Sequence, residues 1–204
     1  MAETYDWPTT LPFASLRLDP IAISRSGGAN LAGVEQITDS GATVWRMLAT
    51  VRLGSDADVR AFRAIRSQAR GRANRIRFDL GALTLTARPA GLSGLSGDQF
   101  LATAAADIGD TDIEVDDSGF TLTDLEGCWV SVGDGYLHEV AAVNAGTSTI
   151  TLNPGLRAAI AVSDPVSVAP VFVARAASDD TLTLPIELDG YATMELTFIE
   201  AFDR

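Results

Sequence analysis

The segment from Thr43 to Leu80, TVWRMLATVRLGSDADVRAFRAIRSQARGRANRIRFDL, decides the expected fold. Its first part, Thr43 to Leu53, alternates apolar and polar residues, which is the period-two pattern of a half-buried strand. Its last part, Asn74 to Leu80, alternates in the same way. The middle part repeats apolar residues at helical spacing, so we predict one amphipathic helix between two strands. A helix laid on a sheet closes the core of a β-rich domain.

The ends of this helix are also marked in the sequence. Gly54 ends the first strand, and Ser55 stands three residues before Asp58, which is the spacing of a helix N-cap and its acidic partner. Gly71 is expected to end the helix. The apolar stripe that should face the sheet consists of Val59, Phe62, Ile65 and Ala69.

Positive charge is concentrated in the same segment. The chain contains no lysine, and nine of its fifteen arginines lie between Arg46 and Arg77. In one interpretation they form a solvated helix face whose aliphatic stems cover apolar surface. In the other they form an interface with acidic surface on a neighbouring copy or partner, because the planar guanidinium pairs with a carboxylate in two places. The candidate oligomer-interface residues are Arg60, Arg63, Arg66 and Arg70.

Composition limits the function. The chain has 204 residues, is 47% hydrophobic and carries a formal net charge of −12, so we expect a packed globular protein. The acidic balance argues against sequence-specific nucleic-acid binding, although a channel through which DNA slides without adhering stays compatible with it. No apolar run approaches the roughly 18 residues that span a bilayer, and no secretory signal opens the chain. We therefore expect no membrane insertion and synthesis in the cytoplasm.

The distribution of charge divides the chain into two predicted domains. Residues 1–100 and 170–204 are expected to form one discontinuous β-rich domain, a sandwich or split barrel with the packed helix. The boundary is the glycine- and serine-rich stretch from Arg88 to Gly97. Between Leu101 and Pro170, eleven carboxylates stand against one arginine, Arg157.

Short strands and turns in residues 101–169 predict an inserted acidic β-barrel, resembling either an oligonucleotide-binding fold or a sandwich. Turn signals such as Asp134-Gly135 separate the strands. The predicted strands run from Thr111 to Val115, Cys128 to Val132, Tyr136 to Val143, Thr147 to Leu152 and Pro165 to Val168.

The two ends of the chain are predicted as follows. Residues 1–20 should form an irregular arm anchored by Trp7, Leu11 and Phe13. Short strands should follow from Ile21 to Arg25 and from Leu31 to Thr38, with turns at Gly27-Gly28 and at Asp39-Ser40-Gly41.

At the carboxyl end, the segments from Thr181 to Leu188 and from Tyr191 to Phe202 should form a hairpin that completes the first sheet. Alternation places one set of residues of the last strand on a common face: Ala192, Met194, Leu196, Phe198 and Glu200.

The chain is poor in catalytic groups. His138 is its single histidine, and no G-x-S-x-G elbow supplies a serine nucleophile. Cys128, the single cysteine, is expected to be a small buried hydrophobe; one cysteine and one histidine cannot fill a zinc site without several carboxylates. Paired carboxylates for glycoside hydrolysis leave no local trace in a sequence, and nothing positive supports them. We predict that the chain is not an enzyme and binds no cofactor.

An acidic string from Asp107 to Asp117 invites comparison with a calcium loop. An EF-hand loop needs glycine at its sixth position and glutamate at its twelfth. Counted from Asp110, those positions hold Val115 and Thr121. The better interpretation is a strand whose Ile113 and Val115 face inward while its carboxylates face solvent.

Three groups of motifs carry a resemblance to a known family. The first is Trp45-Arg46-Met47 with Phe62-Arg63-Ala64 and GRANRIRF at 71–78. The second is GCWVSVGDGYLHEV at 127–140 with TITLNPGLRAA at 149–159, and the third is MELTFIEAF at 194–202. In this order the chain resembles the distal tail (minor tail, tail-tip ring) proteins of long-tailed, siphovirus-like phages and prophages. Cys128 and His138 depart from the family's usual residues at their positions.

The resemblance implies a structural virion protein without catalytic residues. Such proteins are taken to form a six-membered ring at the far end of the tail tube, with the first domain in the ring wall and the second projecting outward. The implied partners are copies of the chain itself, as a homo-hexamer, the tail tube protein, and the hub and baseplate proteins of the tail tip. The implied location is the virion tail tip, after synthesis in the host cytoplasm, with roles in host attachment and DNA ejection.

The charge layout agrees with a ring independently of the resemblance. Acidic walls let DNA pass without adhesion. A basic segment and an acidic remainder can pair head to tail around a heterologous ring, and neighbours would seal unpaired edge strands.

Two alternatives stand beside the ring. A carbohydrate-binding or adhesion module of the tail tip would present aromatic side chains on an exposed face, and Trp129 and Tyr136 are the candidates for glycan contact in the insertion. A tail-associated hydrolase would need a catalytic pair that the sequence does not reveal.

Overall fold

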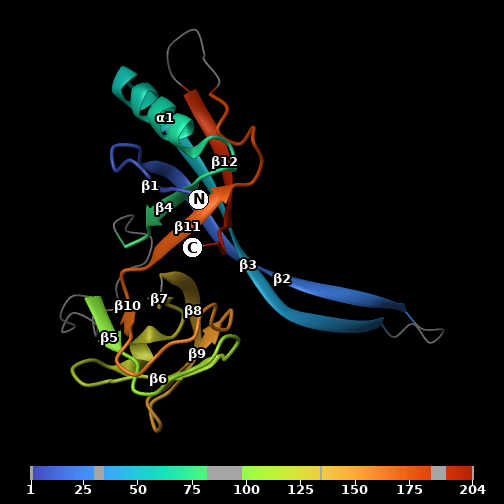
Figure 1. Ribbon diagram of the computed structural model, residues 1–204, viewed down its shortest axis with the longest axis vertical. Coiled ribbons are helices and arrows are strands. Elements are labelled where there is room, and N and C mark those ends of the chain that lie inside the picture. Colours follow the sequence, from blue (N-terminus) through green and yellow to red (C-terminus); the bar gives the residue numbers. More distant parts are fainter. Residues whose placement is uncertain (1, 30–34, 82–97, 134, 185–191, 204) are drawn as a thin grey trace.

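The computed structural model describes residues 2–29, 35–81, 98–133, 135–184 and 192–203. These residues form two six-stranded sheets, one α-helix and one short 3-10 helix. The prediction of a mainly β fold with a packed helix is confirmed. Figure 1 shows the helix at one end of the long axis of the molecule and the second sheet at the other end.

The first sheet has the strand order β1-β4-β11-β12-β3-β2. Strands β1 and β4 are parallel, and the other neighbours are antiparallel. The bounds of its strands are β1 (Thr4–Asp6), β2 (Phe13–Ala29), β3 (Glu35–Leu53), β4 (Arg75–Asp79), β11 (Val171–Ala176) and β12 (Ala192–Glu200).

Helix α1 (Asp56–Ala69) follows β3 and forms as its sequence predicts. The Asp58 backbone N–H donates to Ser55 Oγ (3.2 Å), and the Asp58 carboxylate accepts from the Gly54 backbone N–H (3.0 Å). These bonds satisfy donors that a helix start would leave free. Phe62, Ile65 and Ala69 are buried, and Val59 packs beside them.

The helix ends at Ala69, two residues before the predicted glycine, and Arg70 is its C-cap. Arg70 takes the left-handed conformation (φ 50°), and its backbone N–H donates to the Arg66 carbonyl (3.2 Å). Gly71 follows at φ 65°. Because glycine adopts positive φ without steric cost, it allows the chain to leave the helix toward β4.

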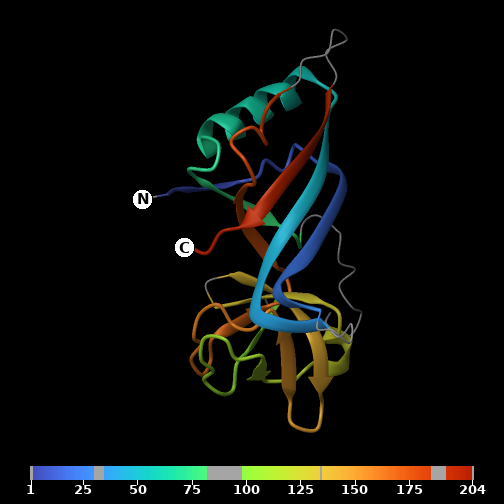
Figure 2. The same ribbon diagram turned by 90° about the vertical axis from the view of Figure 1, so that its right-hand side faces the viewer.

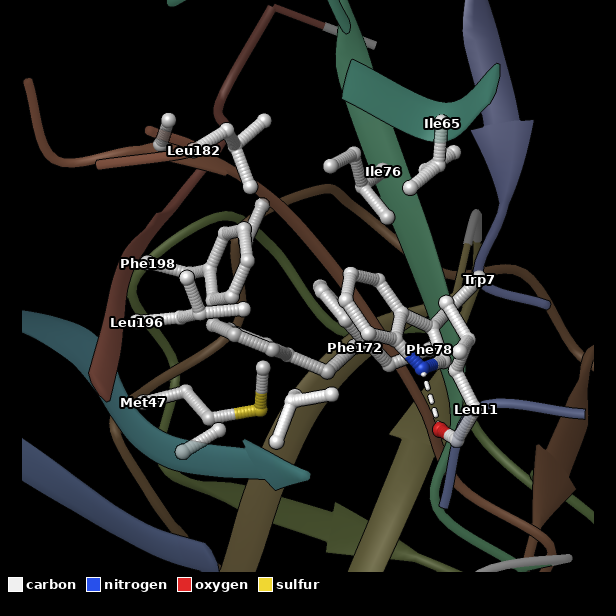
Figure 3. Packing of buried hydrophobic residues seen from close by; sticks show 14 of the residues in the cluster. Trp7, Leu11, Met47, Ile65, Ile76, Phe78, Phe172, Leu182, Leu196 and Phe198 are labelled. Atoms are coloured by element: carbon white, nitrogen blue, oxygen red, sulfur yellow. Dashed lines mark hydrogen bonds between the residues drawn. The ribbon is translucent and has the colours of Figure 1, made fainter. Parts of the chain in front are cut away.

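Aromatic rings fill the core between the helix and the first sheet (Figure 3). Phe78 lies 4.9 Å from Phe198 and 6.1 Å from Phe172, measured between ring centroids. Trp7 stacks on Phe13 at 5.1 Å, and its indole N–H donates to the Leu11 carbonyl (2.9 Å). Trp7 and Leu11 are buried and Phe13 packs against the cluster, so the predicted anchors are confirmed. The prediction that residues 1–20 form an irregular arm is wrong, because residues 4–6 belong to β1 and residues 13–20 to β2, where they pair with β4 and β3.

The strand predicted from Ile21 to Arg25 is confirmed as part of the longer strand β2, whereas the turns predicted at Gly27-Gly28 and at residues 39–41 are wrong. Strands β2 and β3 form one long hairpin, and the register pairs Ser24 with Asp39 and Arg25 with Thr38, so no turn occurs at residues 39–41. Gly28, at φ 81°, lies where the register shifts between Ser26 and Ala29. The glycines therefore serve a bulge, which mimics a turn signal in the sequence. Part of the predicted strand at 31–38 lies outside the described residues.

The second sheet has the order β5-β10-β7-β8-β9-β6. Its edges meet through an antiparallel bridge between Ala102 and Val115, with backbone hydrogen bonds of 2.9 Å from Thr103 to Glu114 and from Asp116 to Leu101. The sheet therefore closes into a small barrel. The bounds are β5 (Gln99–Leu101), β6 (Asp112–Glu114), β7 (Trp129–Val132), β8 (Tyr136–Asn144), β9 (Thr149–Asn153) and β10 (Pro165–Ser167), with the 3-10 helix η3 (Leu122–Leu125) between β6 and β7.

Five of these strands agree within two residues with the strands predicted between residues 111 and 168, whereas β5 was not predicted. A hydrophobic cluster separate from that of the first sheet fills the barrel, and it includes Val130, Val140, Ile150 and Val166. The strands of the first sheet lie on both sides of the barrel strands in the chain. The predicted boundary loop at 88–97 lies outside the described residues.

The predicted carboxyl-terminal hairpin is corrected in part. Residues 181–184 are not in a strand, and residues 185–191 lie outside the described part of the chain. Turn hydrogen bonds hold this region: the Thr181 N–H donates to the Ser178 carbonyl and the Thr183 N–H to the Asp180 carbonyl. Serine and aspartate favour such turns over strand. Strand β12 pairs instead with β3 and β11, and its predicted inward face is confirmed, because residues 192, 194, 196, 198 and 200 are all buried.

Replacing Phe62 with alanine tests the packing of the helix on the sheet. We expect Phe62→Ala to lower the free energy of unfolding by about 3–5 kcal/mol, because the side chain is fully buried and its loss leaves a cavity. The matched control, Gln68→Ala on the exposed side of α1, should stay within about 0.5 kcal/mol of the wild type. Urea denaturation measures both. Equal effects of the two substitutions would contradict the packing described.

Candidate functional site

The four predicted interface arginines lie together on α1. Arg60, Arg63, Arg66 and Arg70 are all exposed, and their spacing of three or four residues places them along one side of the helix. We call this set the arginine face. Within the described part of the chain, none of the four forms a salt bridge.

Stabilisation of the helix explains only part of the arginine face. Arg66 lies in the last turn and Arg70 at the C-cap, where a positive charge interacts favourably with the helix dipole. Arg60 and Arg63 lie before that turn and gain no such stabilisation. The helix dipole therefore accounts for Arg66 and Arg70 and does not decide between a solvated face and an interface for Arg60 and Arg63.

Two other arginines, Arg75 of the basic segment and Arg175 of β11, have internal roles. Arg75 donates through Nη2 to the Ala2 carbonyl (2.6 Å) and through Nη1 to the Asp203 carbonyl. Arg175 donates to the Arg72 carbonyl (2.7 Å) and pairs with Asp203. These contacts fix both ends of the chain beside β4 and β11, so these side chains are not available to a partner.

The barrel carries carboxylates on its outer side. Along β6 and the two residues that follow it, Ile113 and Val115 are buried, whereas Asp112, Glu114 and Asp116 are exposed, as the alternation predicts. We call these three carboxylates the acidic β6 face. Asp112 accepts from the Thr151 hydroxyl (2.6 Å). Hydrogen bonds from the Ser118 backbone N–H and hydroxyl lower the pKa of Asp116, so that carboxyl is ionised at neutral pH.

Nothing in the described residues favours a metal at this acidic string. No group of three or more histidine, cysteine, aspartate or glutamate side chains comes together there in an arrangement that could hold an ion. The neighbouring carboxylates serve local structure: Asp110 accepts from the Asp107 backbone N–H (2.8 Å), and Asp117 accepts from the Ser148 hydroxyl (3.0 Å).

Arg157, the arginine of the barrel segment, points toward the first sheet. Its Nη2 lies 3.4 Å from Glu200 Oε2 and also donates to the Thr43 carbonyl. Its guanidinium lies over the Phe202 ring, 4.9 Å from the centroid. The Arg157 side chain is 15% exposed and that of Glu200 is fully buried. The positive charge of the barrel segment is therefore neutralised at the contact between the sheets, and its outer surface keeps the carboxylates.

Further contacts join the barrel to the first sheet in the same region. The Trp45 indole N–H donates to the Leu137 carbonyl in β8 (2.8 Å). Within the first sheet, the Trp45 backbone N–H donates to Glu200 Oε2 (3.2 Å) and so holds the carboxylate that faces Arg157. The Val171 N–H donates to Ser131 Oγ (2.9 Å). We call this set of contacts the sheet–barrel junction. It fixes the barrel on the sheet through backbone and buried side-chain groups.

The candidate glycan-binding aromatics belong to the junction. Tyr136 is 8% exposed, and its hydroxyl donates to the Phe202 carbonyl (3.3 Å). Trp129 is half-buried and meets Trp45 edge to face, with ring centroids 6.4 Å apart. These two residues therefore do not form the exposed platform expected of a carbohydrate-binding module. The run of buried residues 136–138 signals a strand covered on both faces, which alternation alone does not reveal.

The single histidine and cysteine have structural surroundings. His138 is fully buried in β8, with Nδ1 2.8 Å from the Pro154 carbonyl. Cys128 is half-buried, rather than buried as predicted. It lies just before β7, outside the strand, and its thiol donates to the Asp124 carbonyl (3.4 Å). Burial and the Asp124 charge raise the pKa of this thiol, which is the opposite of what an activated nucleophile needs.

The sequence patterns did not predict the most prominent surface feature, which is a hairpin of β2 and β3. Strand β12 pairs with β3 from Arg46 to Leu53, and beyond Arg46 the described hairpin consists of β2 and β3 alone. Figure 1 shows this two-stranded part extending away from the body of the molecule. We call it the projecting hairpin, residues 21–29 and 35–44. At about 3.3 Å per residue it is about 30 Å long.

No protein-family model matches the chain, and no curated protein matches it either. Within the described ranges, no helix has the length and apolar character needed to cross a membrane.

Removing the Glu200 carboxylate tests the sheet–barrel junction. We expect Glu200→Ala to lower the free energy of unfolding by about 3–5 kcal/mol, because it leaves the largely buried Arg157 without its partner. The control Glu195→Ala, at an exposed position of the same strand, should change it by less than about 0.5 kcal/mol. Urea denaturation measures both.

A double-mutant cycle separates the ion pair from general damage. Glu200→Ala combined with Arg157→Ala should cost about 1–3 kcal/mol less than the sum of the two single substitutions, because the second removes the charge that the first leaves unpaired. Additive costs would contradict a direct interaction between these side chains.

Proposed function

We propose that the protein is a structural component of a phage tail tip, in which copies of the chain assemble into a ring that joins the tail tube to the hub and receptor-binding parts. The ring has six copies, and its lumen lets DNA pass. The partners are other copies of the chain, the tail tube protein and the hub or baseplate proteins. The sequence resemblance suggests this identity, and the projecting hairpin is the observation that best supports an assembled state.

The projecting hairpin supports assembly for a physical reason. A two-stranded hairpin without a covering layer is marginally stable in water. Strand β2 is also an edge strand of its sheet, and no further described strand pairs with its outer side. A neighbouring subunit would cover the hairpin and pair this edge. The projecting hairpin is therefore stabilised by contact with another copy or a neighbouring protein, whereas it adds no stability to an isolated monomer.

The chemistry of the described residues is consistent with a structural role. His138 is enclosed in the barrel, the Cys128 thiol has a raised pKa, and Trp129 and Tyr136 lie in the sheet–barrel junction. No observation on the described residues therefore favours the carbohydrate-binding alternative or the hydrolase. The net charge of −12 agrees with a lumen that does not retain DNA.

Electron microscopy of the purified full chain tests this proposal together with a truncated hairpin. The variant replaces residues 23–42 with Asn-Gly, which closes a two-residue turn between the paired residues Ala22 and Thr43. We expect closed rings for the wild type and isolated subunits for the variant. Circular dichroism and thermal unfolding should show that the variant keeps the fold, because beyond Ala22 and Thr43 the described parts of β2 and β3 pair with each other and with no other described strand.

Two outcomes would count against the ring. Wild-type particles that stay monomeric at every concentration would contradict the proposal, and monomers that bind glycans would favour the adhesion alternative. Rings that form equally well without the hairpin would show that the assembly does not use this arm.

A further inference from the structure

We infer that the arginine face of α1 docks on the acidic β6 face of a second copy of this chain. The inference rests on the proposed function, since it names one contact between copies in that assembly. Four exposed guanidinium groups on one side of a helix would meet three exposed carboxylates on the outer side of a strand. The planar guanidinium can bind each carboxylate with two parallel hydrogen bonds.

These two surfaces cannot meet within one chain. Helix α1 lies at one end of the long axis and β6 at the other, and both views agree on this placement (Figures 1 and 2). The sheet–barrel junction holds the barrel in that position through Glu200, Arg157 and Trp45. Attraction between the two faces therefore acts between separate molecules.

The two charged rows have similar lengths. At 1.5 Å per helical residue, Arg60 to Arg70 spans about 15 Å. At about 3.3 Å per strand residue, Asp112 to Asp116 spans about 13 Å. A helix lying along the strand can therefore bring two or three of its arginines opposite carboxylates at once.

The rest of the charge distribution makes this contact selective. The arginine of the barrel segment, Arg157, is committed to Glu200 and cannot neutralise the acidic β6 face from within. With a net charge of −12, two copies repel each other in most orientations. The orientation that brings the arginine face to the acidic β6 face replaces repulsion with attraction, which favours one docking geometry over others.

The contact is heterologous, because it joins opposite ends of two molecules. Such contacts build closed rings when the rotation between neighbours closes, and open stacks when it does not. Docking of the arginine face on the acidic β6 face therefore orients successive copies head to tail, which the projecting hairpin alone does not do.

Paired charge reversal tests this contact in the full chain. We expect the double variant Arg63→Glu with Arg66→Glu to weaken self-association about tenfold or more, and Asp112→Arg with Glu114→Arg to do the same. A chain that carries all four substitutions should regain association, because each reversed face then meets its reversed partner. Sedimentation velocity at about 0.05 M and about 0.5 M salt measures this, and high salt should weaken the wild-type contact.

Matched controls carry the same change of charge at other exposed positions. Arg52→Glu with Arg77→Glu controls for the helix pair, and Asp124→Arg with Glu126→Arg controls for the strand pair. Both should associate nearly as the wild type does. Circular dichroism should show that all variants fold.

The outcomes separate this inference from the proposed function. A wild-type chain that never associates contradicts the ring itself. If the charge reversals weaken association no more than the controls do, the docking of these two faces is overturned and the ring stays in place. The same holds if the variant with all four substitutions does not regain association. Loss of binding to duplex DNA in the Arg63→Glu, Arg66→Glu variant, with association unchanged, would assign the arginine face to nucleic acid and would also overturn it.

Discussion

A fully buried carboxylate holds the two halves of this molecule together. Glu200, at the end of β12 in the first sheet, accepts from the Trp45 backbone N–H and pairs with Arg157 of the barrel segment. Burying a carboxylate costs several kcal/mol unless it is paired. The docked barrel therefore supplies, through Arg157, the positive charge that the buried Glu200 carboxylate needs, and this pairing favours the docked position of the barrel. The indole of Trp45, which donates to Leu137, adds a second link in the same place.

The sheet–barrel junction fixes the orientation of the barrel relative to the first sheet. It fixes the barrel at one end of the long axis, opposite α1, while the hairpin extends to the side (Figure 1). The aromatic residues that could have formed a binding platform are used in the contact. What remains on the outside is an arginine face, an acidic barrel and a free strand edge. In the proposed assembly, these are the features that would contact neighbouring copies of the chain.

Much of the fold could be predicted because its signals are local. Ser55 and Asp58 cap the helix through bonds three residues apart, and the alternation in residues 192–200 reports which face is buried, including Glu200. The barrel strands were predicted for the same reason, since turns such as that before β8 bound each strand. The exposure of the four helix arginines also followed from helical spacing alone.

What could not be predicted depends on contacts between distant residues. Gly27-Gly28 and residues 39–41 look like turns, yet pairing along the whole of β2 and β3 overrides them and turns the glycines into a bulge. The partner of Arg157 lies 43 residues away in the chain. The positions of Trp129 and Tyr136 depend on how the barrel docks, which no local pattern encodes.

The central claim is that the protein acts as an assembled unit. Native mass spectrometry of the full chain tests it most directly, because it counts copies without assuming a shape. The account predicts one dominant species at the mass of six chains, with dissociation to single chains as the salt concentration rises. A spectrum that contains single chains alone, at every protein concentration and at low salt, would contradict it.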